Sequence, residues 1–295
     1  MKIAVVAHRK KSLGGGLGEL RRVLADLGLV DVMWFEVPKS KKAPKKVKQA
    51  VEAGVDRVFV WGGDGTVQRC LDVLAGSDVS MAVLPAGTGN LFATNLGIPI
   101  DLEKAAEIGA RGNLRRIDVG RVNGERFGVM AGVGADAQMI QDADRGLKDR
   151  LGRGAYVFTG LKGIRDATVK VKVDVDGKRF YSGKAGSVLV GNVGKLMGGV
   201  EAFDDAEPDD GKLDVGVVTA TTPTQWGRVV ARATTGRTAN SKYVRVTNGT
   251  RIKIRLKGKR LYQVDGGDRE KVQQLKLRVE PAALSVCVPA DRVSG

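Results

Sequence analysis

The fold is indicated by one stretch of sequence, Val58-Phe59-Val60-Trp61-Gly62-Gly63-Asp64-Gly65-Thr66-Val67. Its four apolar residues are β-branched or aromatic, which predicts a buried strand. The glycines that follow permit a tight turn, and Thr66 is expected to cap a helix over residues 67–74. A buried strand that leads through such a turn into a helix is typical of α/β proteins.

The same turn has the chemistry of a polyphosphate site. Gly62, Gly63 and Gly65 let main-chain N–H groups approach an anion, and the start of a helix adds a positive dipole end. Asp64 could hold Mg²⁺ against the phosphates. The alternative is a purely structural turn in which the aspartate only caps backbone groups.

A second turn of this kind follows one strand later, in Leu84-Pro85-Ala86-Gly87-Thr88-Gly89-Asn90-Leu91-Phe92-Ala93. Turns at the carboxyl ends of neighbouring parallel strands border one crevice, so the pair favours a nucleotide over two independent turns. No G-x-G-x-x-G follows the first strand and no G-x-x-x-x-G-K-[ST] occurs, which argues against a dehydrogenase and a Walker-type NTPase.

Outward from these turns, strand and helix patterns alternate over roughly the first 115 residues. Strands are expected at 3–7, 32–37, 55–61 and 81–84, and helices after the glycines 14–16 and at 45–53, 67–74, 90–96 and 102–110. This rhythm predicts a Rossmann-like α/β nucleotide-binding domain with a mostly parallel sheet covered on both faces.

Beyond about residue 116 the pattern becomes that of hairpins. Three turn signals, Asn123-Gly124, Asp176-Gly177 and Asn248-Gly249, each separate two strand-like runs, at 119–122 and 126–130, at 169–175 and from 180, and at 244–247 and 251–256. Helices are expected at 136–147 and 224–234. We therefore predict a mainly antiparallel β-sandwich as the substrate domain over residues 118–281, with the first domain made of residues 1–117 plus 282–295.

Composition limits the function. Lys plus Arg number 49 against 33 Asp plus Glu, a net charge of +16 that attracts phosphates of a nucleotide, a nucleic acid or an anionic membrane, unless it serves only solubility. A single histidine excludes a three-histidine metal centre. Few aromatics and no RNP-like stretch argue against nucleic acid. The absence of a signal peptide, of a ~20-residue apolar run and of paired cysteines favours a cytoplasmic protein.

The two turns, together with the Leu96-Gly97-Ile98-Pro99 that follows them, resemble the diacylglycerol kinase catalytic-domain family. That family includes bacterial soluble diacylglycerol kinases and sphingosine and ceramide kinases, and is distantly related to NAD kinases. The resemblance continues in order through five further segments: 117–120, 131–137, 209–214, Val264-Asp265-Gly266 and 281–284.

The resemblance implies ATP and Mg²⁺ as cofactors. Asp64 matches the family aspartate associated with nucleotide and Mg²⁺. Its nucleotide-contacting loops match Gly62, Gly63, Gly65, Thr66, Gly87, Thr88, Gly89 and Asn90. Asp210, with Glu207 and the carbonyl of Lys212, matches a second, structural Mg²⁺ site; the alternative is an acidic surface loop.

The sequence departs from the family pattern in three places. An Asn-Pro usually follows the first strand, whereas residues 7–12 carry Lys11 and Ser12, which could serve phosphate by another route. The aspartate often found after Asn90 is Leu91. The glutamate proposed as general base falls on Gly267, so either Asp268 or Asp265 takes that role, or positioning and charge neutralisation suffice.

The expected function is an ATP-dependent lipid kinase that converts diacylglycerol to phosphatidic acid, acting peripherally on the inner face of an anionic membrane. The alternatives are a sphingoid-type lipid kinase, an NAD kinase-like enzyme, and a non-catalytic nucleotide- or nucleic-acid-binding protein. The oligomeric state is left open, with a homodimer as one option.

Overall fold

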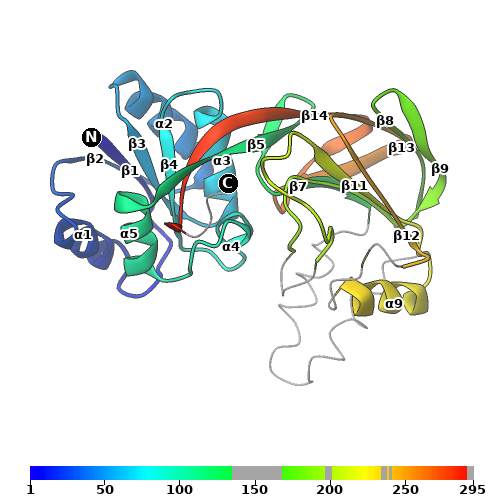
Figure 1. Cartoon of the computed structure of the whole chain (residues 1–295), viewed down its shortest axis with the longest axis horizontal. Coiled ribbons are helices and arrows are strands. Elements are labelled where there is room, and N and C mark those ends of the chain that lie inside the picture. Colours follow the sequence, from blue (N-terminus) through cyan, green and yellow to red (C-terminus); the bar gives the residue numbers. More distant parts are fainter. Residues whose placement is uncertain (135–167, 197–200, 234–237, 239–240, 291–295) are drawn as a thin grey trace. The chain divides into compact units, whose positions relative to one another are not determined.

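The computed structural model describes residues 1–134, 168–196, 201–233, 238 and 241–290 of the chain (Figure 1). The chain forms two compact units. Unit 1 comprises Met1–Val119, Arg126–Gly128 and Glu280–Gly295, and unit 2 comprises Gly120–Glu125 and Val129–Val279. The predicted division into independently folding domains, residues 1–117 plus 282–295 and residues 118–281, stays a prediction.

Unit 1 is an α/β sheet. Its strands are β1 (Ile3–His8), β2 (Val32–Val37), β3 (Arg57–Gly62) and β4 (Ser80–Pro85), which run parallel in the order β2–β1–β3–β4. The end of β14 (Gly267–Val288) lies parallel to β4, where Val286 is level with Met81. Every residue of β1, β3 and β4 is buried, as continuous apolar runs require in a covered parallel sheet.

The helices of unit 1 follow the expected alternation with the strands (Figure 1). They are α1 (Gly16–Asp26), the 3₁₀ turn η1 (Ser40–Lys42), α2 (Ala43–Glu52), α3 (Asp64–Leu74), α4 (Leu91–Asn95) and α5 (Leu102–Arg111). Helix α5 packs on β4 and against α1, and α3 packs on β3 and against α2. These helices enclose the sheet and leave the turns at its strand ends as the parts that can meet a ligand.

Unit 2 is mainly antiparallel. Its elements are β7 (Met130–Gly134), β8 (Val169–Val175), β9 (Lys178–Ala185), β10 (Ser187–Gly191), β11 (Leu213–Val218), α9 (Pro223–Ala233), β12 (Val244–Gly249) and β13 (Arg251–Val264), with the first part of β14. The strands run in the order β12–β11–β10–β7–β13–β14, and β8 joins β13 to β9. The predicted fold class is therefore confirmed.

One predicted hairpin is wrong. β12 pairs with β11, whereas β13 pairs with β14, β7 and β8, so Asn248-Gly249 does not turn one strand onto the next. The carboxylate of Asp176 accepts hydrogen bonds from the N–H groups of Thr250 and Arg251, which holds the start of β13 beside β8. Tertiary contacts override the local turn signal here.

The single strand predicted over residues 126–130 is divided between two strands in the structure. β5 (Asn113–Val122) turns through Asn123 and Gly124 into β6 (Glu125–Phe127), and β7 starts afresh at Met130. The break falls at Gly128, where a Cβ atom would lie 2.6 Å from the Phe92 ring. The predicted helix over 136–147, and residues 135–137 of the motif at 131–137, lie outside the described residues. Of the helices that the structure describes, none is long and apolar enough to cross a membrane.

Candidate nucleotide site

Two glycine turns lie side by side in unit 1 because the strands that lead into them are neighbours. β3 and β4 run in register to their ends, where Trp61 is level with Leu84 and Gly62 with Pro85. The N–H of Ala86 donates to the carbonyl of Gly62 over 2.9 Å, one residue beyond the ladder. The structure thus brings together the first turn, residues 62–66, and the second turn, residues 87–90.

The two turns touch through their glycines. A side chain at Gly87 would place its Cβ atom 2.5 Å from the Cα of Gly63 and 2.9 Å from Oδ1 of Asn90. A Cβ atom at Gly62 would lie 2.6 Å from that of Thr66. Gly65, in contrast, is exposed and a Cβ atom there would meet nothing within 4 Å. Gly62, Gly63 and Gly87 are therefore required by packing, whereas Gly65 leaves an open approach to the start of α3.

Asp64 links the first turn to the second. Its Oδ2 accepts a hydrogen bond from the N–H of Asn90 over 2.8 Å, and its Oδ1 accepts one from Leu91 over 2.6 Å. The aspartate thus caps α4 rather than the helix in which it lies. Burial raises the pKa of Asp64 above its ordinary value, and the backbone N–H groups of Leu91 and Asn90 oppose that rise.

The side chain of Asn90 closes the second turn. Its Oδ1 accepts from the N–H of Gly87 and its Nδ2 donates to the carbonyl of the same residue, both over 2.8 Å. Asn90 has a left-handed backbone with φ at 49°, which asparagine adopts more readily than most residues, and only 3% of it is exposed. Both ends of its amide bond the backbone of Gly87, so its role is to shape the turn.

The predicted cap by Thr66 is wrong. Helix α3 begins at Asp64, with Gly63 before it, so Thr66 lies inside the first turn of the helix. Its hydroxyl is 3.0 Å from the hydroxyl of Ser40 in η1, and 2% of the residue is exposed. Sequence patterns did not indicate Ser40, because η1 and α3 are joined only by the fold.

Donors remain available around these turns. The N–H groups of Gly65, Thr88 and Gly89 have no hydrogen-bond acceptor among the described parts of the chain. Thr88 is exposed and Gly89 partly so. The N-terminus of the 11-residue helix α3 supplies a partial positive charge at the same place. Together these groups can bind an anion with several oxygens.

Lys11 approaches the first turn, as predicted for a phosphate contact. Its Cε lies 3.8 Å from where a Cβ atom of Gly63 would stand. Ser12 next to it is exposed, and the structure gives it no contact with either turn. His8 is 8% exposed, and burial, followed by the charge of Lys11, lowers its pKa. His8 is therefore neutral at physiological pH and adds no fixed charge.

The candidate base residues lie in unit 2, at the turn between β13 and β14. Oδ1 of Asp265 accepts from the N–H groups of Val129 and Met130 over 3.0 and 2.8 Å, and 8% of the residue is exposed. Asp268 is exposed, and its Oδ1 accepts from Nε2 of Gln263 over 2.9 Å. Asp265 is thus part of the backbone framework, whereas Asp268 faces solvent.

Arg269 occupies the space beside Gly267. Its Nη1 donates to the carbonyl of Gly267 over 2.8 Å and would lie 2.7 Å from a Cβ atom at that position. The same guanidinium makes a two-pronged ion pair with Glu125. The sequence did not point to Arg269, since only the fold places Glu125 next to it.

The predicted second metal site lies in the loop before β11. Glu207 and Asp210 are both exposed, and the N–H of Lys212 donates to Oδ1 of Asp210 over 2.9 Å. Burial, and then the charges of Asp210 and Asp205, raise the pKa of Asp214 to about 6. No cluster of three or more His, Cys, Asp or Glu side chains suited to a metal ion occurs in the described ranges, and the Mg²⁺ site stays a prediction.

Known proteins share this architecture. The diacylglycerol kinase catalytic domain matches residues 3–122, and the YegS C-terminal NAD kinase beta sandwich-like domain matches residues 128–288. A diacylglycerol kinase of Bacillus subtilis is 32% identical over 232 residues, which are 76% of this chain and 75% of that protein.

Solved structures agree on the fold. A diacylglycerol kinase from Bacillus anthracis superposes with a TM-score of 0.75 at 21% identity, covering 99% of this chain and 98% of its own. An NAD kinase from Archaeoglobus fulgidus in complex with ATP gives a TM-score of 0.52 at 14% identity, over 99% and 95% of the two chains. With two family domains that follow one another along the sequence, the chain belongs to the diacylglycerol kinase family of lipid kinases.

Proposed function

We propose that this protein transfers the γ-phosphate of ATP to a lipid hydroxyl, with diacylglycerol as acceptor and phosphatidic acid as product. The observation that carries the proposal is the contact between the two glycine turns, with Asp64 bonded to the backbone of the second turn. Such a preformed cradle of N–H groups needs little reorganisation when phosphates bind. Membership in a lipid kinase family supports the choice of acceptor.

In this proposal the triphosphate lies over the N-terminus of α3. The N–H groups of Gly65, Thr88 and Gly89 bind phosphate oxygens, and Lys11 places its ammonium group against their charge. Gly62, Gly63, Gly87 and Asn90 shape the two turns, and Thr66 anchors α3 to η1. The hydroxyl of Ser12 is proposed as a further hydrogen-bond donor to phosphate. The chain thereby orients the γ-phosphate and neutralises its charge before transfer.

Asp64 is the residue that fits Mg²⁺ in this cradle. Mg²⁺ prefers carboxylate oxygens, and Asp64 carries the one carboxylate among residues 62–66 and 87–90. When bound, Mg²⁺ neutralises charge on the β- and γ-phosphates. The backbone hydrogen bonds of Asp64 fix its orientation, so the carboxylate is held ready at one place.

We assign the general base to Asp268 rather than Asp265. Asp268 is exposed, whereas both backbone N–H groups held by Asp265 would lose their acceptor if that carboxylate turned to a substrate. A loose transition state leaves much of the hydroxyl proton in place until the phosphoryl group is nearly free. A carboxylate one residue beyond the family position could therefore still accept the proton.

The proposed lipid acceptor determines where in the cell the enzyme acts. A lipid hydroxyl lies in a bilayer, and a chain with a net charge of +16 is attracted to an anionic surface from the aqueous side. We therefore propose a peripheral enzyme at the inner face of the cytoplasmic membrane. Its binding to anionic vesicles should fall steeply between ~50 and ~500 mM salt, as the Debye length shortens.

The test is a direct transfer assay. Purified protein receives labelled ATP and Mg²⁺ with diacylglycerol, a sphingoid base, NAD or no acceptor, each lipid in mixed vesicles. Label in phosphatidic acid supports the proposal, and label in the sphingoid base or in NAD moves the assignment to that acceptor. Full-length folded protein that labels none of them, at any Mg²⁺ concentration, contradicts the kinase assignment.

A further inference from the structure

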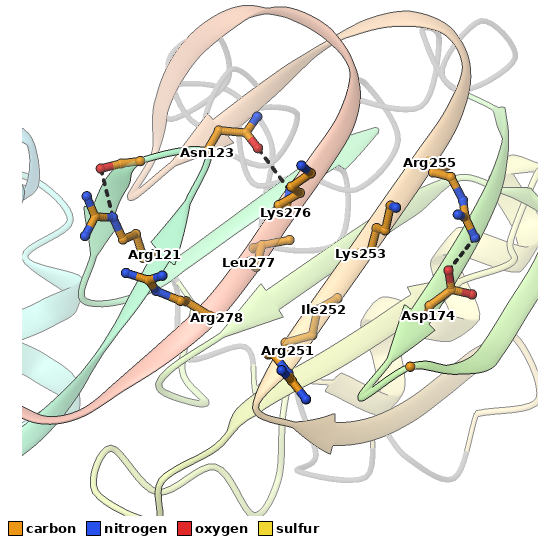
Figure 2. Close-up of a pocket in the computed structure, with 12 residues that line it drawn as sticks. Arg121, Asn123, Asp174, Arg251, Ile252, Lys253, Arg255, Lys276, Leu277 and Arg278 are labelled. Carbon is orange, nitrogen blue, oxygen red and sulfur yellow. Dashed lines mark hydrogen bonds and ion pairs between the residues drawn. The ribbon is translucent and has the colours of Figure 1, made fainter.

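Unit 2 carries a groove in which nearly all the charged lining residues are basic (Figure 2). It is an open groove with a volume of about 680 Å³, within the range of sites for small molecules. Six basic residues line it: Arg121, Arg251, Lys253, Arg255, Lys276 and Arg278. Asp174 is the single acidic residue among its lining residues. None of these residues enters the proposed transfer reaction.

Five of the six basic residues come from two neighbouring strands in register, and Arg121 comes from β5. Arg251 is opposite Arg278 and Lys253 is opposite Lys276 in the antiparallel pair of β13 and β14. The residues between them, Ile252 and Leu277, are 2% and 3% exposed. Because side chains alternate along a strand, the cations share the face opposite that core, as Figure 2 shows.

Like charges directly opposite one another destabilise a sheet. Two such pairs in succession are therefore a cost to the fold that a bound anion would remove. The side chains of Lys253 and Lys276 form no hydrogen bond or ion pair within the part of the chain that the structure describes. Two lysines that bind no anion are expected to lie further apart on a surface than this directly opposed pair.

Asp174 is already engaged. Its carboxylate is shared between Arg179 and Arg255, and the hydrogen bond from Arg179 is the main cause that lowers its pKa. This carboxylate offsets Arg255 and adds a weaker attraction on Lys253, but in the described part of the chain it forms no ion pair with Lys253 or Lys276.

One wall of the groove is held firmly. Oδ1 of Asn123 accepts from the N–H of Lys276 over 3.0 Å, and Nδ2 donates to the carbonyl of Gln274 over 3.2 Å. Nε of Arg121 donates to the carbonyl of Gly124 over 3.2 Å. The turn at Asn123 and Gly124 is thus fastened against β14 beside the basic residues.

We propose that this groove binds a phosphorylated ligand through Lys253 and Lys276, with Arg251 and Arg278 beside them. Phosphate monoesters and diphosphates match the chemistry, since several charged oxygens can accept from ammonium and guanidinium groups at once. The phosphate belongs either to a soluble molecule or to a lipid headgroup. The groove shares no residue with the proposed ATP cradle of unit 1.

The test compares two double variants of the full chain. Lys253→Gln/Lys276→Gln removes the central pair, and Lys259→Gln/Lys271→Gln removes two exposed lysines of the same strands that do not line the groove. Both change the net charge equally. Calorimetry with inorganic pyrophosphate reports the soluble source, and sedimentation with vesicles of phosphatidic acid in phosphatidylcholine reports the headgroup.

We expect the groove variant to bind at least one of the two probes about tenfold more weakly than wild type, with the control within about twofold. Loss with pyrophosphate identifies a soluble ligand, and loss with vesicles alone identifies a headgroup. At low salt without ligand, the groove variant should also melt at a higher temperature than the control, because its like-charge contact is gone. Equal binding by the two variants, or loss in both alike, overturns the proposal.

Discussion

The glycine turns of unit 1 and the turn between β13 and β14 in unit 2 both correspond to motifs of the family, but they differ in how the chain holds them. In unit 1 the side chain of Asp64 accepts from backbone N–H groups at the end of the second turn, and the side chain of Asn90 bonds the backbone of Gly87 within that turn. In unit 2 Asp265 accepts from the backbone N–H groups of Val129 and Met130, whereas Gly267 has no side chain and Asp268 accepts from the side-chain amide of Gln263.

The difference indicates which positions can change. A residue that supplies hydrogen bonds to two buried N–H groups leaves both unsatisfied when it is lost. Gly267 has no side chain that accepts from buried N–H groups, so its replacement leaves none unsatisfied. The space beside it is taken by Arg269. A match to the family at Asp64 or Asp265 can therefore be due to the structural role of the aspartate as well as to catalysis. Experiments have to separate these two roles.

The largest effect is expected for Asp64→Ala. It removes the proposed Mg²⁺ contact and the tie between the turns, so turnover should fall on the order of 1000-fold, about 4 kcal/mol of transition-state stabilisation. Asp101→Ala is the matched control, since Asp101 caps α5 in the same unit by accepting from Lys104. Initial rates with labelled ATP measure both. If folded Asp64→Ala turns over within threefold of wild type, Asp64 has no role in transfer.

The next comparison separates Asp268 from Asp265. Asp268→Asn should lower kcat by ~100-fold, as expected for loss of a general base. Asp265→Asn keeps the oxygen that accepts from Val129 and Met130, so kcat should stay within about threefold.

Asp265→Ala serves as the structural control and should lower the free energy of unfolding by about 2 kcal/mol. Urea unfolding and ATP binding are measured beside kcat. A fall in kcat confined to Asp265→Asn would move the base to Asp265. Unchanged kcat in both variants would leave positioning to carry the reaction.

Restoring the family residue gives a smaller effect. In Gly267→Glu the new side chain displaces only the end of Arg269, which is flexible, so the fold should lose about 1 kcal/mol. A carboxylate at the family position should raise kcat severalfold and make Asp268→Asn less damaging in the double variant. Independent, additive effects of the two substitutions would contradict a shared role.

The smallest effect concerns the second metal site. If Glu207, Asp210 and the Lys212 carbonyl hold Mg²⁺, millimolar Mg²⁺ should raise the Tm of wild type by a few degrees, about 1 kcal/mol. Asp210→Asn should abolish that rise, whereas Asp26→Asn, an exposed carboxylate of α1, should preserve it. Thermal melting with and without chelator measures both. Equal responses of the two variants would make the loop an ordinary acidic surface.

The sequence was informative where the signal is local. Buried apolar runs predicted the strands of unit 1, and the glycines predicted the turns at their ends. It failed where two partners are far apart: Thr66 meets Ser40 and not a helix end, and Asp176 holds the start of β13 so that the Asn248-Gly249 signal does not make a hairpin. Neither partner can be identified from spacing, because only the folded chain brings them together.

The path of β14 has a consequence for how the protein is made. Val286 completes the sheet beside Met81, and Ala283 accepts the N–H of Gly76, so unit 1 is closed by residues synthesised about 200 positions later. At ordinary elongation rates the edge of β4 waits roughly 10–40 s on the ribosome before its neighbour emerges. During that time an unpaired apolar strand edge is exposed to other nascent chains. Emergence of β14, rather than of the first 119 residues, should set the moment at which the sheet of unit 1 is completed.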